Sequence, residues 1–262
     1  VSDAPFGPFE FQDVALPVRG AEYWDGLCTH NPTIHEFDGK YYLYYMGNTG
    51  DGKVVGEPGK PELNWVHRNN QRIGVAVAES PEGPWKRSDK PVLDITHGDS
   101  LAHDALMTSN PSVCRRPDGG YLMVYKAVGL KYDLPFGGPV VHMVAMADNP
   151  TGPFTKFTDP IFLKEGERFP AEDPYIWYQE GRYRAIVKWM TATDGSRDFS
   201  MVQYESEDGI HWKKARYFEI SDRTITWENG RSQTFTHLER PQVWIENGEP
   251  VALLCAADTL DE

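Results

Sequence analysis

Short apolar runs recur along the chain in pairs, and each pair begins with the same kind of residue. A polar residue and a proline precede an apolar, aromatic run, and a turn separates this run from a second one. The four openings are Asn31-Pro32, Asn110-Pro111, Asp173-Pro174 and Arg240-Pro241. Their prolines are 79, 63 and 67 residues apart. A repeat of this length, built from short strands and turns, is typical of a β-propeller or a similar array.

A second motif, Pro-Xaa-Gly-Pro before an aromatic residue, indicates two further strands in each repeat. It occurs in Asp3–Phe9, Glu79–Trp85 and Asp148–Phe154, with a looser copy in Glu205–Trp212. Alternating runs precede the later copies, at Ile73–Ala78, Val141–Ala147 and Met201–Tyr204. We expect four-stranded blades, in which strand one follows Xaa-Pro, strand two follows an Asp-Gly-type turn, and strands three and four flank Pro-Xaa-Gly-Pro. The predicted fold class is all-β, a five-bladed β-propeller with four repeats visible and one blade incomplete or truncated.

The repeats do not begin in phase with the chain. Residues 1–9 resemble the end of a blade, and residues 240–255 resemble the beginning of one. In one interpretation the N-terminal strand completes the C-terminal blade, which removes free sheet edges. In the other, which we favour, a blade is missing because the chain is a fragment. Residues 1–262 are then one propeller domain, truncated at its N-terminus.

Composition excludes several classes of partner. The chain has 26 basic and 39 acidic residues, and its net charge of −13 argues against nucleic acid or an anionic membrane. No run approaches the about 18 apolar residues of a membrane span. Three cysteines build no disulfide framework and are expected to be buried free thiols. No nucleotide, zinc-protease or serine-hydrolase motif occurs, so we expect no metal ligands and no required cofactor, although a structural Ca²⁺ could occupy the channel.

Antiparallel pairing brings the start of strand one and the end of strand two to the same face of each blade. Because the innermost strands of a propeller line its channel, these positions should converge on one funnel. Strand-one starts supply His30, Asn31, Asn110, Glu172, Asp173, Glu239 and Arg240, and strand-two ends supply Lys126, Lys188 and Trp189. Each opening asparagine also has a plain structural role, since Asn-Pro turns bond their own backbone.

Three funnel carboxylates, Glu172, Asp173 and Glu239, are the predicted catalytic groups. Carboxylates that lie close together push their pKa values apart, and this separation lets one donate a proton while another stays ionised. Glycoside hydrolysis requires that division of roles. Lys126, Lys188 and Arg240 could supply the neutralising cations; the structural alternative is a set of salt bridges between neighbouring blades.

Further polar residues are candidate substrate ligands beside the funnel. Asp25 and Asp104 each precede an opening asparagine by six residues, and His237 lies close to the last opening. Arg72 opens a predicted third strand and could bind a substrate carboxylate or sulfate with two hydrogen bonds. For the histidines and for Arg72, a packing or surface role is the commoner alternative.

The openings, the Pro-Xaa-Gly-Pro turns and the run Gly39–Tyr45 resemble those of five-bladed β-propeller glycoside hydrolases of the family 43 and family 32 type. The resemblance spans nearly the whole chain and is specific for the superfamily, not for one activity. It implies that Glu239 is the general acid and that Asp173 tunes it. The family's base is an Asp before Pro in the first blade; here Asn31 holds that place, or the base precedes Val1. Glu172 is an addition to the usual pattern and leaves a Glu172/Glu239 pair open.

Three functions remain open at this point. The leading one is a monomeric, secreted or periplasmic glycosidase that acts at the ends of plant or algal polysaccharide side chains, of arabinofuranoside or xyloside type. The second is a carbohydrate-binding propeller without catalysis, which the amides at Asn31 and Asn110 favour. The third is an interaction propeller without a sugar site. It predicts that Glu172, Asp173 and Glu239 do not cluster and lie more than about 12 Å apart, beyond either glycosidase geometry.

Overall fold

The chain folds into antiparallel sheets whose strands follow one another in sequence order. The computed structural model describes residues 2, 6–51, 64–190 and 200–258. Three sheets have four strands, in the orders β1-β2-β3-β4, β5-β6-β7-β8 and β12-β11-β10-β9. A fourth sheet pairs β15 with β16, and β13 pairs with β14 in a separate hairpin. The all-β class is confirmed; the number of five blades stays a prediction.

The first sheet consists of β1 (Cys28–Phe37), β2 (Lys40–Asn48), β3 (Arg72–Ala78) and β4 (Lys86–Arg87). The second consists of β5 (Met107–Arg115), β6 (Tyr121–Val128), β7 (Val140–Ala147) and β8 (Thr155–Lys156). The third consists of β9 (Ala171–Gln179), β10 (Arg182–Trp189), β11 (Ser200–Ser206) and β12 (Lys213–Ser221). The remaining elements are the short helix α1 (Trp65–Asn69), β13 (Thr224–Thr226), β14 (Ser232–Thr234), β15 (His237–Glu246) and β16 (Glu249–Asp258).

The predicted turns form between the first two strands of each sheet. Asp38-Gly39, Glu180-Gly181 and Asn247-Gly248 have positive φ at both residues, and in the first, third and fourth sheets these two residues alone join the paired strands. Turns of this kind match the twist of the strands that they connect. The third strands also form as predicted, because β3, β7 and β11 contain the three alternating runs.

The openings depart from the prediction in one respect, because strand one does not begin after Xaa-Pro but runs through it. Asn31, Asn110, Asp173 and Arg240 all adopt positive φ, between 46° and 52°. The pairing register shifts at each of these places, as it does between His30 and Thr33. A proline cannot donate to the ladder, and a bulge with one left-handed residue lets the strand continue past it. The sequence shows the proline but not the bulge.

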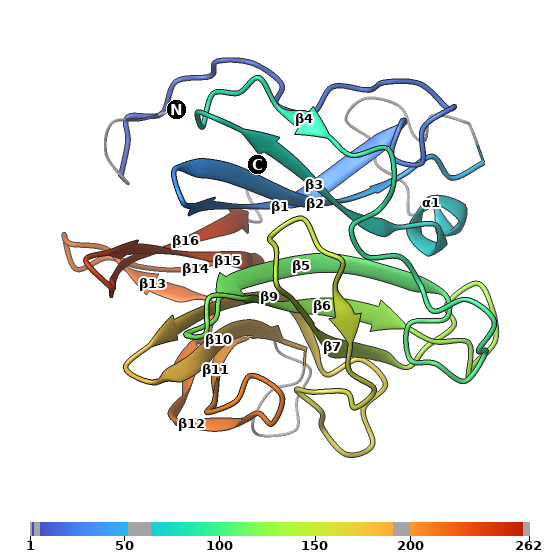
Figure 1. Cartoon of the computed structure of the whole chain (residues 1–262). Coiled ribbons are helices and arrows are strands. Elements are labelled where there is room, and N and C mark those ends of the chain that lie inside the picture. The colour runs from blue at the N-terminus through green and yellow to red at the C-terminus, as the bar shows by residue number, and fades with distance from the viewer. Residues whose placement is uncertain (1, 3–5, 52–63, 191–199, 259–262) are drawn as a thin grey trace.

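Neighbouring sheets pack face to face and enclose successive parts of the core (Figure 1). Tyr44 and Ile73 of the first sheet pack with Met123 of the second, and Leu122 of the second packs with Val187 of the third. The third and fourth sheets are joined by a smaller cluster that contains Tyr175, Trp177, Ile186, Met201, Leu238 and Val243. The inward face of each sheet is therefore fixed by its apolar alternation.

The described part of the chain before β1 does not form the last strand of a blade, although the sequence predicted one there. Residues 6–27 form no strand, and no described residue pairs with the outer edge of β16. Asp3, Ala4 and Pro5, the start of the first Pro-Xaa-Gly-Pro motif, lie outside the described residues. Closure of the last sheet by an N-terminal strand is not seen in the part of the chain that the structure describes.

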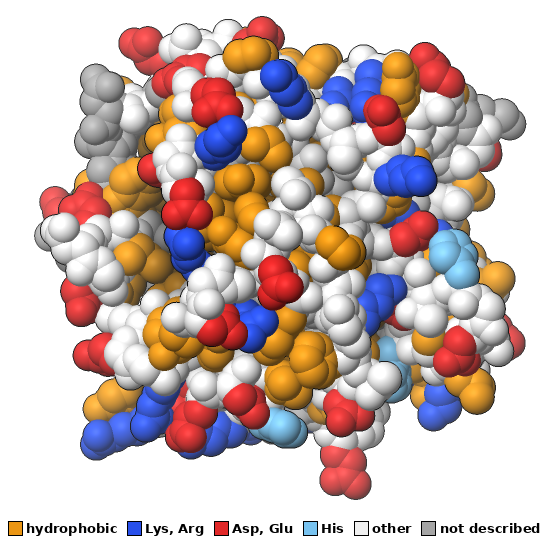
Figure 2. Space-filling model, in the orientation of Figure 1, with side chains coloured by type: hydrophobic (Ala, Val, Ile, Leu, Met, Phe, Trp, Pro, Cys, Tyr) orange, Lys and Arg blue, Asp and Glu red, His pale blue; other side chains and the backbone are white. Residues whose placement is uncertain are grey.

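The three cysteines are free thiols, as predicted, and Cys114 is buried whereas Cys28 and Cys255 are partly buried. Among the described residues, no helix is both long and apolar enough to cross a membrane. Acidic and basic side chains are interspersed over the face shown in Figure 2.

Candidate active site

The four openings meet around one small cavity, as the repeat predicts. The cavity has a volume of about 30 Å³ and is lined by Asn31, Pro32, Thr33, Asn110, Pro111, Asp173, Pro174, Arg240, Pro241 and Gln242. A hydrogen bond of 3.0 Å from Thr33 Oγ1 to Gln242 Oε1 joins the first sheet to the fourth across this ring. One position from each of four sheets therefore contributes to a single site.

The residues just before the openings, and the lysines opposite them on the second strands, form ion pairs. Glu172 pairs with Lys188 across β9 and β10, and the equivalent position of β6 holds Lys126. Each lysine reaches the glutamate of the following sheet: Lys126 Nζ lies 2.6 Å from Glu172 Oε1, and Lys188 Nζ donates to Glu239 Oε2. Lys188 Nζ also lies 3.6 Å from Glu172 Oε2. One ammonium group thus bridges the two glutamates.

Glu172 is held in its ionised form. Burial acts to raise its pKa, but the charges of Lys126 and Lys188 outweigh burial and lower the pKa to about 2. The same attraction acts on Lys188, whose pKa lies above its usual value although burial opposes this. The carboxylate of Glu172 is therefore a base or an electrostatic stabiliser rather than a proton donor near neutral pH.

Asp173, the next residue, has the opposite tendency. Burial, and after it the negative charge of Glu172, raise the pKa of Asp173 to about 6. The side-chain amide of Asn110 in the neighbouring sheet donates a hydrogen bond to Asp173 Oδ1. Two adjacent carboxyl groups with pKa values driven apart are the arrangement that acid–base catalysis requires.

The fourth sheet completes the cluster. Arg240 Nη1 lies 3.3 Å from Glu239 Oε1, so Glu239 is contacted by both Lys188 and Arg240. Across the ring, burial and then the charges of Arg240 and Lys126 lower the pKa of His30 to about 4. His30 is therefore a neutral imidazole near pH 7, able to donate or accept a hydrogen bond. Its Nε2 lies 3.4 Å from Gln71 Nε2.

The predicted catalytic residues thus lie together, with Asn31, Asn110, His30, Lys126, Lys188 and Arg240 around them. Because one ammonium contacts both glutamates, Glu172 and Glu239 are no farther apart than the about 5 to 9.5 Å that glycosidase pairs span. This clustering is the opposite of what an interaction propeller without a sugar site predicts. The roles of these residues in binding and catalysis remain proposals.

Asp25 and Asp104 lie outside this ring and have structural partners in their own sheets. Asp25 is fully buried; Arg19 Nε donates to its Oδ1 at 2.7 Å, and Tyr45 Oη donates to its Oδ2 at 2.6 Å. Asp104 repeats the pattern one sheet later, with Lys156 in ion-pair contact at 2.5 Å. Their prediction as substrate ligands rested on their spacing from the opening asparagines. Buried ion pairs within one sheet give a different reason for that spacing.

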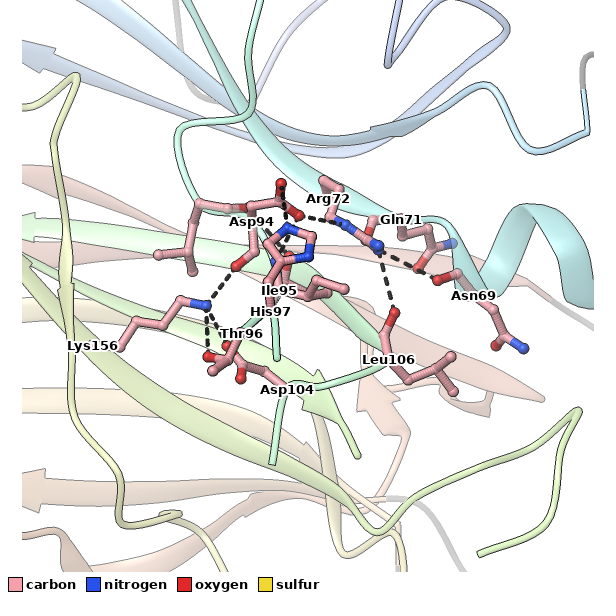
Figure 3. A network of polar contacts seen from close by, with 12 residues as sticks. Asn69, Gln71, Arg72, Asp94, Ile95, Thr96, His97, Asp104, Leu106 and Lys156 are labelled. Carbon is pink, nitrogen blue, oxygen red and sulfur yellow. Dashed lines mark hydrogen bonds and ion pairs between the residues drawn. The ribbon is translucent and has the colours of Figure 1, made fainter. Parts of the chain in front are cut away.

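Arg72 belongs to the same structural region (Figure 3). Its Nε donates to Asp94 Oδ1 at 2.7 Å, and its Nη1 donates to the carbonyl oxygens of Gln71 and Leu106 at 2.6 and 3.3 Å. Figure 3 shows how these contacts and those of Lys156 tie the segment around Asp94 to the second sheet. The guanidinium is occupied by contacts within the protein, and its binding of a substrate anion stays a prediction.

Trp189 and His237 also have partners within the protein. Trp189, which the sequence analysis placed at the funnel, is 2% exposed and packs against Tyr204 and Phe218, so its ring belongs to the core. The Nδ1 of His237 lies 2.9 Å from Asp258 Oδ2 on the neighbouring strand. Alternation along β10 could have indicated the inward direction of Trp189.

Two residues near the cluster were missed by the sequence analysis. His142 pairs with Lys126 across β6 and β7 and is 1% exposed, and neither of its ring nitrogens has a described hydrogen-bond partner. Burial, and after it the charge of Lys126, lower its pKa to about 3. Arg68 of α1 lies near enough to Glu172 for that charge to act on its pKa. Nothing in the repeat pattern indicates either residue.

Among the described residues, no group of three or more His, Cys, Asp or Glu side chains is placed to hold a metal ion. A structural Ca²⁺ in the channel therefore remains a prediction that these residues neither support nor test.

No family model and no curated protein matches the chain. Solved structures do resemble it. A family 117 glycoside hydrolase of the marine bacterium Zobellia galactanivorans is 22% identical, with a TM-score of 0.56, over 80% of this chain and 52% of that one. A structure described as a glycoside hydrolase is 14% identical, with a TM-score of 0.61, over 86% and 64%. A Bacillus subtilis arabinanase is 19% identical, with a TM-score of 0.50, over 88% and 68%.

At these identities the likeness shows the fold. The chain shares its all-β architecture of four-stranded antiparallel sheets with glycoside hydrolases, and it spans 52% and 64% of the length of the first two. The resemblance noted in the sequence is supported at this level, without assignment to one family.

Proposed function

We propose that this chain is a glycoside hydrolase whose acid–base groups are the carboxylates around Lys188. The observation that carries the proposal is the joint placement of Glu172, Asp173 and Glu239 beside the cavity where four sheets meet. Salt bridges that only join sheets would not require a third carboxyl group with a pKa raised to about 6. The fold shared with glycoside hydrolases supports the same reaction class.

Each carboxyl group has a distinct role in this proposal. Glu239 protonates the leaving oxygen, and Glu172, ionised next to two lysines, stabilises positive charge on the sugar or activates water. Asp173 adds a titrating charge beside both and orients the sugar. His30, Asn31 and Asn110 supply neutral hydrogen-bonding groups for sugar hydroxyls, and Lys126, Lys188 and Arg240 hold the acids in place.

The substrate is proposed to be the end of a plant or algal polysaccharide side chain, of arabinofuranoside or xyloside type. The cavity of about 30 Å³ is too small for a sugar ring, so in this proposal the sugar lies outside it, against the glutamates. A funnel where four sheets meet would suit chain ends better than chain interiors. One of the similar structures is an arabinanase, which agrees with this sugar class.

The test is the release of sugar from chromogenic arabinofuranosides and xylosides. Glu239→Gln should lower kcat/KM by about 10²–10⁴-fold, the usual contribution of a general acid. Glu246→Gln is the matched control, because Glu246 lies on the same strand and is exposed, bonded to Trp244 Nε1 at 2.9 Å. Thermal unfolding of both variants separates loss of chemistry from loss of fold. Full activity in Glu239→Gln would remove Glu239 as the acid.

A carbohydrate-binding protein without catalysis is the second candidate. Asn31 and Asn110 occupy openings where an acid would serve as the base, and this observation favours it. Binding of the oligosaccharides by calorimetry, with no product released after prolonged incubation, would establish this candidate and contradict hydrolysis.

A further inference from the structure

Two arginines stack on aromatic rings at the rim of the candidate site. Arg68 of α1 lies 5.6 Å from the ring centre of Trp65 and 5.3 Å from that of Phe136. Arg168 lies 3.7 Å from the ring centre of Tyr132 and 5.6 Å from that of Phe136. We call these five residues, which come from α1 and from the loops after β6 and β8, the cationic rim.

The cationic rim adjoins the carboxylate cluster. Figure 1 shows α1 at the end of the second sheet where β6 finishes, and Lys126 lies near that end of β6. Lys126 Nζ, which binds Glu172, lies 5.8 Å from the ring centre of Phe169, the residue after Arg168. The charge of Glu172 also acts on Arg68, opposing the lowering of its pKa by burial. Lys126 therefore lies between Glu172 and the loop that carries Arg168.

Among the described residues, the two rim arginines have no carboxylate partner, unlike most other arginines. Arg19, Arg72 and Arg115 each form an ion pair with an aspartate. No carboxylate of the described residues lies within 4.0 Å of the guanidinium of Arg68 or Arg168. Their described hydrogen bonds go to neutral oxygens, from Arg68 Nη1 to Phe136 O at 2.6 Å and from Arg168 Nη2 to Gly137 O at 3.5 Å.

Unpaired positive charge beside a catalytic cluster is notable in a chain of net charge −13. A guanidinium has five N–H donors in a planar fork that matches a carboxylate or a sulfate, and stacking on a ring holds that plane in position. The remaining donors of both arginines are thus oriented without being consumed by an internal anion. Neutral sugars would leave that charge without a counterpart.

We propose that the cationic rim binds an anionic substituent, a carboxylate or a sulfate, on the sugar that adjoins the bond to be cleaved. The inference rests on the proposed function, because it names the substrate class of that same site. The substrate is accordingly an acidic or sulfated polysaccharide rather than a neutral one.

Calorimetry with matched oligosaccharides tests the inference. The probes are a xylo-oligosaccharide with one glucuronate, a galactan oligosaccharide with one sulfate, and the uncharged parent of each. We expect at least one charged probe to bind about tenfold more tightly than its parent, with an advantage that shrinks as NaCl increases. The two charged probes distinguish a carboxylate from a sulfate. Equal affinity for charged and uncharged probes would overturn the proposal.

Variants locate the effect at the rim. Arg68→Gln and Arg168→Gln should each reduce the preference for the charged probe at least fivefold, and Arg216→Gln should leave it unchanged. Arg216 is a matched control because it is exposed and lies 5.3 Å from the ring centre of Tyr217, far along the chain on β12. Arg68 also anchors Phe136, so the thermal unfolding of each variant is measured as well. If Arg68→Gln does not fold, the result for Arg168→Gln is the deciding one. An unchanged preference in folded Arg168→Gln contradicts the proposal.

Hydrolysis assays on the same probes separate this inference from the proposed function. Hydrolysis without preference for charged sugars overturns the role of the rim and leaves the glycosidase in place. Tight, rim-dependent binding of a charged probe without hydrolysis overturns the glycosidase and leaves the recognition of an anion in place.

Discussion

Asp173 and Glu172 are neighbours in sequence whose carboxyl groups respond oppositely to pH. The pKa of Glu172 is lowered to about 2 and that of Asp173 is raised to about 6. The folded protein favours the ionised form of Glu172. This preference stabilises the fold at pH values above the ordinary pKa of a glutamate, and the stabilisation is lost as pH falls toward 2. For Asp173 the folded protein favours the protonated form, so stability decreases as pH rises from about 4 to about 6. Adjacent positions thus contribute slopes of opposite sign.

Asp173→Asn should remove the second of these slopes. The free energy of unfolding of the wild type minus that of the variant should fall by about 1–3 kcal/mol as pH rises from 4 to 7. Urea unfolding at a series of pH values measures this difference. Asp148→Asn, an exposed aspartate after β7, is the control and should leave the slope unchanged. A slope identical in wild type and Asp173→Asn would show that Asp173 ionises normally in the fold.

At the scale of single elements, α1 has few residues but sets the position of Arg68. Asn64 caps its N-terminus by accepting hydrogen bonds from Val66 N at 2.9 Å and His67 N at 3.2 Å. A helix of five residues has little cooperative stability of its own, so its cap contributes a large share. The orientation of the rim arginine therefore depends on a residue that does not contact the site.

Asn64→Ala should lower the stability of α1 by about 1 kcal/mol and weaken binding of the charged oligosaccharide, with a smaller effect on the uncharged parent. Calorimetry with both probes checks this result. Asn64→Asp keeps a capping oxygen and serves as the matched control, with affinity close to that of wild type. Equal losses for the two probes would indicate a general loss of fold instead of a local effect at α1.

Elements differ in how much of them the sequence reveals. Alternating runs and Asp-Gly-type turns predicted β2, β3 and β7 because side-chain period and turn chemistry are local properties. The bulges at Asn31 and Asp173 were not predicted, since the pattern of apolar residues carries no record of one left-handed residue. Helix α1 is too short for a helical period.

The candidate site was predicted where it follows from the repeat and missed where it follows from contacts between loops. Glu172 and Glu239 occupy equivalent positions on the first strands, and Lys188 is the partner of Glu172 on the second strand, so the repeat placed all three at one funnel. Arg68 and Arg168 meet only because α1 and the loop after β8 fold over the same end of the second sheet. Trp189 and Arg72 lie at strand positions that could face the funnel. Trp189 instead packs in the core, and Arg72 bonds to neighbouring segments of the protein. Register alone does not distinguish these placements.

At the scale of the whole molecule, the site is shared between sheets of unequal protection. Most residues of β5, β6 and β7 are buried, whereas β16 is largely exposed and β15–β16 is a sheet of two strands. The fourth sheet is joined to the third by a small cluster and by a hydrogen bond of 3.0 Å from Tyr175 Oη to Val243 O. Glu239 and Arg240 therefore lie on the less protected side of the ring, and Glu172 and Lys126 on the better protected side.

This asymmetry predicts the pattern of amide hydrogen exchange. Strands with few buried contacts open at low free energy, so amides of β15–β16 should exchange at least tenfold faster than those of β5–β7 in the free protein. A bound oligosaccharide that contacts Glu239 adds contacts across the ring and should slow exchange in β15 selectively. Mass spectrometry of exchanged peptides measures both effects, with β10 as the internal reference, because it carries Lys188 but is mostly buried. Uniform protection of the second and fourth sheets would contradict the prediction, and ligand-induced slowing confined to β10 would place the sugar away from Glu239.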